Sequence, residues 1–335
     1  MSTVTLSVLD HASITEGSTP GRALRDARDL ARHVERLGYR RFWLSEHHNM
    51  QAIASAATSV SLGFIAEGTS TIRVGAGGVM LPNHSPLVVA EQFGTLESLY
   101  PGRIDLGLGR APGTDPRTMM ALRRDHSAAS AFPHDVQELQ SYFEPAEPGR
   151  PVRAIPGEGL RVPLWILGSS LFGAQLAAQL GLPYAFASHF APDALYEALK
   201  AYREDFRPSR QQSEPYAMAG VNAFVADTDE EARRLFTTMQ QAFLGTVRGA
   251  RGLLRPPVDS LDTMWRPGER ERLEHMLRYS FVGSPETVRR KLELFVTDTG
   301  VDEVMVSSMI YDKQARLRSF ELLADVAGLN GPSAE

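Results

Sequence analysis

Four of the nine histidines in this 335-residue chain follow short apolar segments, where those segments give way to polar residues. They are His11, His47, His48 and His189. An imidazole with an ordinary pKa near 6.5 can accept or donate a proton at neutral pH. If the apolar segments are parallel strands whose carboxyl ends meet, these side chains share one proton-handling pocket. We expect His11, Ser188 and His189 to contact a substrate there.

A metal centre is the main alternative chemistry for these residues, because Glu46, His47 and His48 all carry groups that bind zinc. Adjacent residues on an extended segment point to opposite sides, however, so the three cannot all face one ion. No H-x-H or H-E-x-x-H spacing occurs elsewhere in the chain. We therefore expect no metal site. His47 could instead be a buried structural histidine held by backbone hydrogen bonds.

Two glycine-containing segments are suited to binding a cofactor. Residues 75–78, Gly-Ala-Gly-Gly, allow a flat ring to approach the backbone closely, although a crowded strand end would need the same glycines. Residues 168–170, Gly-Ser-Ser, precede an expected helix, whose free N–H groups and two hydroxyls suit a phosphate. Arg110 could supply a forked cationic partner to the same group. Simple helix capping by the serines is the alternative.

The elements that position these residues alternate between short apolar strands and helical stretches, a pattern typical of βαβ units. It predicts eight strand–helix units in one α/β domain over residues 1–335, a (β/α)8 TIM barrel with insertions. An open doubly wound sheet is less suitable, since no glycine fingerprint follows the first strand. The expected strands are 4–9, 41–45, one beginning at 72–75, 103–108, 163–167, 184–188, 216–225 and 303–307. The expected helices are 20–37, 53–66, 86–100, two within 115–142, 172–180, 192–206, one capped by Thr228, 285–297 and one ending near 326.

Composition excludes several classes of protein. A net charge of −5 gives no basic surface for nucleic acid. The absence of cysteine excludes disulfides and thiolate metal sites and fits a cytoplasmic protein. The first residues have no signal-peptide pattern, and no apolar run approaches the ~20 residues that span a bilayer. We expect a soluble protein without membrane contact.

The chain resembles the bacterial luciferase-like flavin-dependent monooxygenase family over nearly its whole length. The segments that carry this resemblance are 38–39 with 42–48 (FWLSEHH), 74–86 (VGAGGVMLPNHSP), 90–92, 101–103, 107–110 (GLGR), 165–170 (WILGSS), 181–183 and 282–286. Luciferases proper have a reactive cysteine where this chain has Gly109, so the resemblance implies a non-luminescent member.

The resemblance implies a barrel that binds FMN at its mouth. His47 matches the family's catalytic histidine, which manages a proton close to the oxygenated flavin. Ala76 and Gly77 match a pair that is joined by a non-prolyl cis peptide beneath the flavin ring. Arg110 and Ser170 match the phosphate clamp. We expect Gly109, Leu167, Gly168 and Ser169 to complete the cofactor site.

The implied reaction uses reduced FMN and O2 to oxidise a small organic substrate, with a separate flavin reductase supplying electrons. Family members often dimerise through the region of the 53–66 helix, so a homodimer is expected. The irregular segment 249–281 is a candidate lid over the mouth; a disordered surface insertion is the alternative. A deazaflavin-dependent oxidoreductase, an NAD(P)H:flavin reductase and a flavin-storage protein are the other functions open at this point.

Overall fold

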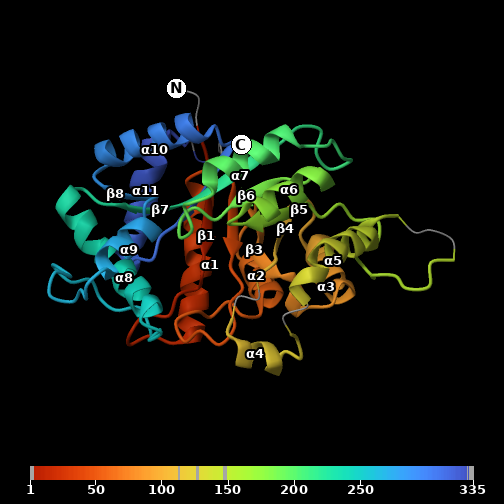
Figure 1. Ribbon diagram of the computed structural model, residues 1–335, viewed down its shortest axis with the longest axis horizontal. Coiled ribbons are helices and arrows are strands. Elements are labelled where there is room, and N and C mark those ends of the chain that lie inside the picture. The colour runs from red at the N-terminus through yellow and green to blue at the C-terminus, as the bar shows by residue number, and fades with distance from the viewer. Residues whose placement is uncertain (1–3, 112–113, 126–127, 146–148, 330, 332–335) are drawn as a thin grey trace.

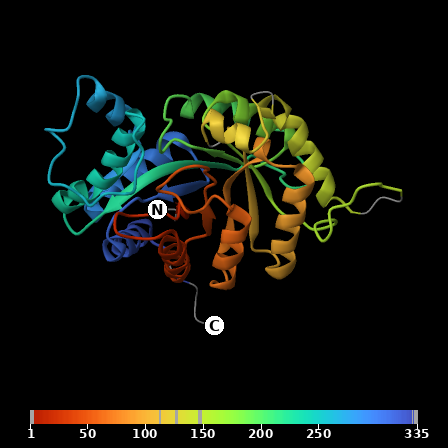
Figure 2. The same cartoon turned by 90° about the horizontal axis from the view of Figure 1, so that it is seen from below.

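In a computed structural model, the strands of this chain close into a parallel barrel. The structure describes residues 4–111, 114–125, 128–145, 149–329 and 331. Strand β6 pairs with β5 and also with β7, which pairs with β9, and β9 pairs with β1. This circuit of eight strands confirms the expected (β/α)8 barrel, surrounded by helices in two views (Figures 1 and 2).

The strands and helices of the described residues agree closely with the expected order. The strands are β1 Thr5–Asp10, β2 Arg41–Leu44, β3 Arg73–Met80, β4 Ile104–Gly109, β5 Leu164–Gly168, β6 Tyr184–Phe186, β7 Ala217–Val225, β8 Ser280–Gly283 and β9 Glu303–Ser307. The helices are α1 Pro20–Arg36, α2 Thr58–Glu67, the 3-10 turn η1 Leu81–Asn83, α3 Pro86–Leu99, α4 Pro116–Ala121, α5 Ala128–Phe143, α6 Leu171–Leu180, α7 Leu195–Glu204, α8 Asp229–Val247, α9 Glu269–Met276, α10 Pro285–Thr299 and α11 Lys313–Ala327. None of these helices is long and apolar enough to cross a membrane.

Local chemistry explains several of these boundaries. The Thr228 hydroxyl accepts a hydrogen bond from the N–H of Glu231 and so caps α8, as predicted. The sequence Ser85-Pro86 also predicts a serine cap for α3, but the Ser85 side chain makes no capping bond, so this prediction is wrong. Helix α2 begins at Thr58, five residues later than predicted, because Ser55 is held in a loop by bonds to the carbonyls of His11 and Ser45.

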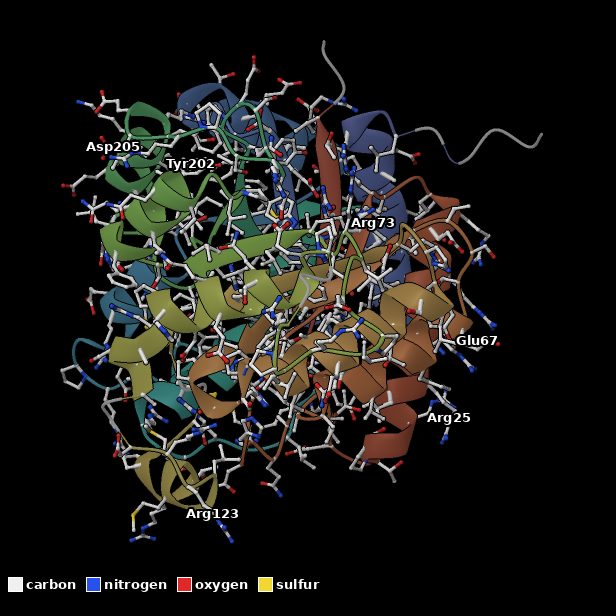
Figure 3. All side chains as sticks on the ribbon, turned by 90° about the vertical axis from the view of Figure 1, so that its right-hand side faces the viewer. Arg25, Glu67, Arg73, Arg123, Tyr202 and Asp205 are labelled. Carbon is white, nitrogen blue, oxygen red and sulfur yellow. The ribbon has the colours of Figure 1, made fainter. Side chains whose placement is uncertain are left out.

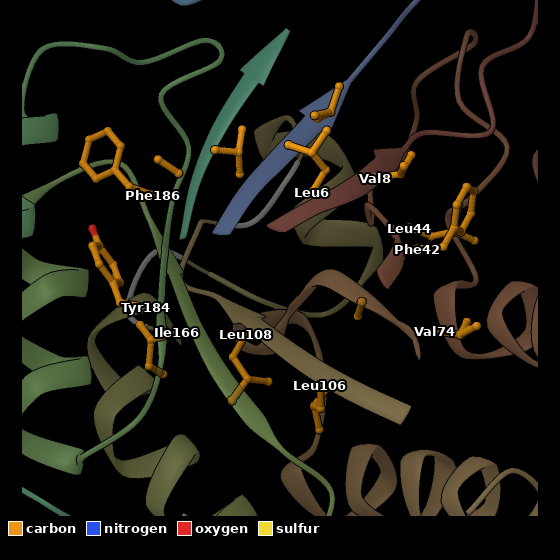
Figure 4. Close-up of a cluster of buried hydrophobic side chains, with 14 of the residues drawn as sticks. Leu6, Val8, Phe42, Leu44, Val74, Leu106, Leu108, Ile166, Tyr184 and Phe186 are labelled. Carbon is orange, nitrogen blue, oxygen red and sulfur yellow. The ribbon is translucent and has the colours of Figure 1, made fainter. Parts of the chain in front are cut away.

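The main hydrophobic core lies between the barrel and the helices around it. Because successive residues of a strand face opposite ways, one set of side chains points outward from each strand. Val74 and Leu106 belong to this set and point toward the surrounding helices in Figure 4. Both are fully buried. The side chains that face inward fill the barrel interior and line its mouth.

Within segment 249–281, residues 249–268 have no helix or strand, as predicted, but the rest of the segment holds regular elements, which corrects the prediction there. It contains α9 and leads into β8, a ninth strand that pairs with the second half of β7. Together with α8 these elements project from one side of the barrel, at the left of Figures 1 and 2. Leu273 and Leu277 pack with Phe224 in an apolar cluster of their own.

A network of ionic residues fills the barrel interior at the amino ends of the strands. The guanidinium of Arg41 bonds to Glu303 at 2.8 Å and to Asp105 at 2.9 Å, and Arg73 contacts Asp105 at 2.6 Å. Burial works against the charge of Arg41, but the two carboxylates outweigh this effect and raise its pKa. In Figure 3, Arg73 lies in the upper part of the molecule, whereas Arg123 lies at its lower edge. Arg123 follows α4, which comes after the carboxyl end of β4. The network therefore lies away from the mouth.

Candidate active site

A pocket opens at the carboxyl ends of the barrel strands, where active sites of this fold are built. Its walls combine apolar side chains, glycines and three histidines. The residues that line it include Leu9, His11, Trp43, Ser45, His47, Gly77, Gly78, Met80, Gly109, Arg110, Phe132, Leu167, Gly168, Ser169, Ser170, Phe172, His189, Phe190, Met218, Gly220 and Met305. The structure therefore brings together residues from all eight strands of the barrel, which are far apart in the sequence.

His11, His47 and His189, three of the four histidines predicted at strand ends, line this pocket. Burial, with smaller contributions from His11 and Arg251, lowers the pKa of His47 to about 3. Burial likewise lowers the pKa of His189 to about 3, and that of His11 below its ordinary value. All three imidazoles are thus uncharged at neutral pH. They offer hydrogen-bond donors and acceptors without a net charge.

His189 has an unusual environment within the part of the chain that the structure describes. The side chain is 8% exposed, and its Nδ1 has no hydrogen-bond partner. This atom lies against the backbone of Gly220, where an added Cβ would come within 2.3 Å of it. The Asn222 amide donates to the His189 carbonyl at 2.7 Å and fixes the backbone. An unsatisfied buried nitrogen is costly, and its packing against Gly220 leaves no room for a partner at this atom.

At the rim of the pocket, Arg110 lies beside the N-terminus of α6. Its guanidinium stacks on the ring of Phe172 at 4.0 Å, and no ion pair or hydrogen bond joins it to another described residue. Ser169 and Ser170 are exposed, and within the described chain Ser170 makes no capping bond to the helix. The simple capping alternative is therefore not supported. Free N–H groups, hydroxyls and a guanidinium at one point form a site for a phosphate-sized anion.

The glycines at the end of β3 form part of the pocket wall, but in a different way from that predicted. Gly77 and Gly78 line the pocket, and an added Cβ would lie 2.8 Å from Leu9 Cδ1 or 2.7 Å from the Gly107 carbonyl oxygen. The non-prolyl cis bond joins Gly77 to Gly78, so the expected Ala76–Gly77 position is wrong by one residue. Ala76 is fully buried in the outer core, on the opposite face of the strand.

Ser188 is a second residue whose predicted place is wrong. Its hydroxyl is fully buried and donates to the carbonyl of Gly220 at 2.6 Å, outside the pocket lining. The expected strand 184–188 ends at Phe186, so the inward and outward alternation no longer holds at residue 188. Its neighbours Ala187 and His189 line the pocket instead.

Glu46, His48 and His84 form a cluster that neighbours the pocket and that sequence reasoning did not assemble. Glu46 Oε1 lies 2.9 Å from His48 Nε2 and 2.7 Å from His84 Nε2. Burial raises the pKa of Glu46, but the hydrogen bonds from the two histidines outweigh it and lower the pKa overall. The three side chains have the chemistry to hold a divalent cation. In this structure, the hydrogen bonds between Glu46 and the two histidines connect the loop after β2 with the end of η1.

Ser45 is a polar pocket residue that sequence reasoning missed. The strand-end pattern that singled out His47 applies equally to residue 45, two positions earlier on the same face. A serine gave no chemical signal by itself, because its contacts with His11 and His47 exist only after the strands are paired.

Comparison with known proteins agrees with this geometry. Residues 3–303 match the family model described as luciferase-like monooxygenase. The chain belongs to the luciferase-like monooxygenase family. A luciferase-like monooxygenase of Escherichia coli K12 is 55% identical over 325 residues, which cover 97% of each chain. The crystal structure of apo-MsnO8 matches with a TM-score of 0.90 and 39% identity, over 97% of this chain and 99% of that one.

More distant members of this fold bind two kinds of flavin. An oxygenating constituent of 3,6-diketocamphane monooxygenase from Pseudomonas putida, solved with FMN, has a TM-score of 0.72 at 18% identity, covering 97% of this chain and 98% of that one. An F420-dependent secondary alcohol dehydrogenase has a TM-score of 0.70 at 15% identity, covering 97% and 99%. At these identities the likeness concerns the fold alone. The family members and the barrel establish this protein as a luciferase-like monooxygenase-family enzyme.

Proposed function

We propose that this enzyme is the oxygenating component of a two-component monooxygenase that takes up reduced FMN and O2 and oxidises a small organic substrate. The observation that carries the proposal is Arg110. It lies without an anionic partner among the described residues, beside the free N-terminus of α6, at the rim of a pocket with uncharged histidines inside. A ligand with one phosphate and a flat neutral ring system fits both parts.

The residues present fit FMN. Arg110, Ser169 and Ser170 would hold the phosphate, and Gly77 with Gly78 would form the wall beside the ring. Packing against Leu9 and Gly107 also requires glycine at these two positions. Bound reduced FMN would supply the electrons that activate O2. His47, on the pocket wall, would offer a hydrogen-bond donor or acceptor toward the substrate, and its low pKa keeps the imidazole neutral.

The substrate is expected to be uncharged. The pocket lining among the described residues contains no carboxylate, and Arg110, its single formally charged residue, would be used by the phosphate. Trp43, Met218 and Met305 provide apolar contact area. A weakly polar molecule with one hydrogen-bonding group, directed to His189 or His11, satisfies these walls.

The proposal includes a flavin reductase that delivers reduced FMN and a second copy of this chain. Exposed apolar side chains on α2 and α3 support a homodimer: Val60 is 74% exposed, Leu99 64% and Val88 44%. Sedimentation should therefore give a dimer. Replacing Val60 and Leu99 with Glu should shift it to monomers.

The phosphate assignment is tested with Arg110→Ala. Charge-assisted hydrogen bonds contribute ~1.5–3 kcal/mol, so FMN should bind roughly tenfold to a hundredfold more weakly in a fluorescence titration. Riboflavin, which has no phosphate, should bind the variant and the parent equally. The matched control is Arg117→Ala, an exposed arginine on α4 outside the pocket lining. Equal losses for FMN and riboflavin would remove the basis of the assignment.

The source of electrons separates this function from its two oxidoreductase alternatives. The purified protein alone should oxidise NADH or NADPH only slowly, and product should form in air once photoreduced FMN or a separate reductase is added. Rapid NAD(P)H consumption without a partner would favour a flavin reductase. Tight deazaflavin binding with turnover in the absence of O2 would favour hydride transfer.

A further inference from the structure

The hydroxyl of Ser45 lies between two of the pocket histidines. Its Oγ is 2.7 Å from His11 Nδ1 and 3.2 Å from His47 Nδ1. Ser45 is 2% exposed, and its backbone N–H donates to the Asp10 carbonyl at 3.0 Å, so the side chain is firmly placed. The two rings meet edge to face with centroids 6.1 Å apart. We infer that Ser45 is a positioning residue that sets the tautomer of His47 by sharing one proton between the two histidines.

The coupling follows from the number of hydrogens that Ser45 and the two imidazoles carry. A serine hydroxyl has one hydrogen to donate, and a neutral imidazole carries its hydrogen on one of two nitrogens. If Ser45 donates to His11 Nδ1, it can accept only from a protonated Nδ1 of His47. If it donates to His47 Nδ1, it accepts from a protonated Nδ1 of His11. In both arrangements the two rings adopt opposite tautomers. If the hydroxyl instead accepted from both Nδ1 atoms, its own hydrogen would be left without a partner among the described residues, which is costly for a buried group.

Neutrality of both rings is what makes this coupling strict. Burial lowers the pKa of both histidines, and neighbouring Arg316 also disfavours a charge on His11, against the opposite effect of Asp10. An imidazolium would carry hydrogens on both nitrogens and would break the rule. Because neither ring is charged at neutral pH, one Nε2 always carries a hydrogen and the other does not.

The consequence for the pocket is a matched donor and acceptor. His47 Nδ1 is engaged by Ser45, so its Nε2 is the nitrogen left for the pocket. His11 Nε2 has a long contact of 3.4 Å with the Ser307 hydroxyl, which can donate or accept and is therefore compatible with either tautomer. In an exchange between the two states, each of Ser307, His11, Ser45 and His47 gives one hydrogen and takes one, so a proton taken from water or a ligand at one end of the chain is matched by one released at the other. The site can thus present His47 as a donor or as an acceptor while its net charge stays constant.

This inference deepens the proposed monooxygenase function, which supplies the reason for a proton at His47, but its test does not need turnover. The apo protein, labelled with 15N, is examined by long-range 1H–15N correlation spectra at neutral pH. His11 and His47 are assigned from His11→Gln and His47→Gln. We expect one ring to show hydrogen on Nδ1 and the other on Nε2, or two exchanging sets that remain opposite.

Three serine variants complete the experiment. Ser45→Ala should free the two rings from each other, so that both take the same tautomer, and Ser45→Thr should restore the opposite pair. Ser55→Ala is the matched control, because Ser55 supports the same loops through the carbonyls of His11 and Ser45 without touching either ring. Its spectra should keep the opposite pair.

Identical tautomers in the parent protein would overturn the inference, and so would an unchanged opposite pair in Ser45→Ala. FMN titration of the same samples keeps the two proposals apart. If FMN fails to bind while the spectra behave as expected, the proposed function fails and the role of Ser45 stands. If FMN binds but the tautomers are uncoupled, the role of Ser45 fails and the proposed function stands.

Discussion

Burial disfavours the charged imidazolium form of each pocket histidine. His189 lies against Gly220 and the ring of Phe190, whose centroid is 4.8 Å from its own. His47 shares its surroundings with His11 and Arg251. Proton transfer at this site therefore begins from neutral imidazole, not from a charged acid. Protonation of these histidines therefore destabilises the folded state.

The stability of the folded protein should therefore depend on pH. A folded-state pKa of about 3 lies below the unfolded value near 6.5, so the unfolded chain binds more protons between those pH values. Stability is fully present above pH 6.5 and should fall as the pH drops, by up to about 1.4 kcal/mol per pH unit for each histidine. Urea unfolding at pH 7.0, 6.0 and 5.0 measures the slope.

Replacing His47 with Gln, which does not titrate, should flatten this slope, whatever it does to stability at pH 7. His134→Asn is the control, since the His134 side chain is 81% exposed and should leave the slope unchanged. The same slope in the parent and in His47→Gln would show that His47 is not held neutral by folding.

At the scale of elements, the segment before α9 touches the mouth of the barrel. Leu254 is buried and pairs its backbone with the loop after β1: the Glu16 N–H donates to its carbonyl at 2.8 Å, and its own N–H donates to the Ile14 carbonyl at 3.0 Å. Residues 255–258 are hydrogen-bonded to side chains of α8, and the rest of the segment packs against α8, away from the pocket. A lid role therefore stays a prediction for residues 249–258 and not for α9.

Hydrogen exchange tests this division. Amide exchange reports local opening, so bound FMN should slow exchange in 249–258 if these residues close over the ligand. Exchange in α9, residues 269–276, should not change and serves as the internal control. Protection of both parts to the same extent would indicate global stabilisation by the ligand, and no protection in 249–258 would exclude the lid.

For the whole molecule, the ionic network around Arg41 ties together strands that are distant in the sequence. Arg41 lies on β2, Asp105 on β4 and Glu303 on β9, and both carboxylates are fully buried. Removing one partner of such a pair leaves an uncompensated buried charge, which typically costs ~3–5 kcal/mol. The network thus makes barrel closure dependent on all three strands.

Arg41→Met should therefore lower the free energy of unfolding by roughly 3–5 kcal/mol in urea at neutral pH. Adding Glu303→Gln should recover part of the loss, because one unpaired charge disappears. Arg270→Met is the comparison: Arg270 pairs with Glu274 on the surface, both side chains are more than half exposed, and the substitution should leave the free energy of unfolding nearly unchanged. A small effect at Arg41 would mean that closure does not depend on this network.

The sequence by itself determined the order of elements and most of the pocket. Apolar segments followed by polar residues predicted His11, His47, Arg110 and the segment at Gly168, because strand ends in a barrel converge whatever the detailed geometry. The same reasoning missed α9, which is rich in Arg and Glu and has weak periodicity, and β8, which is only 4 residues long. Both elements gain order by packing on α8 and β7.

Tertiary structure decided which side of each strand end faces the pocket. At β3 the pairing with β4 shifts register between Ala76 and Val79, which puts Gly77 and Gly78, and not Ala76, at the wall. At β6 the strand ends early and turns Ser188 outward. The bridge from His11 through Ser45 to His47 joins β1 to β2 across a gap of 34 residues. Periodicity describes one strand at a time, whereas register, strand length and contacts between strands are set by how neighbouring strands pack, and only the folded barrel fixes those.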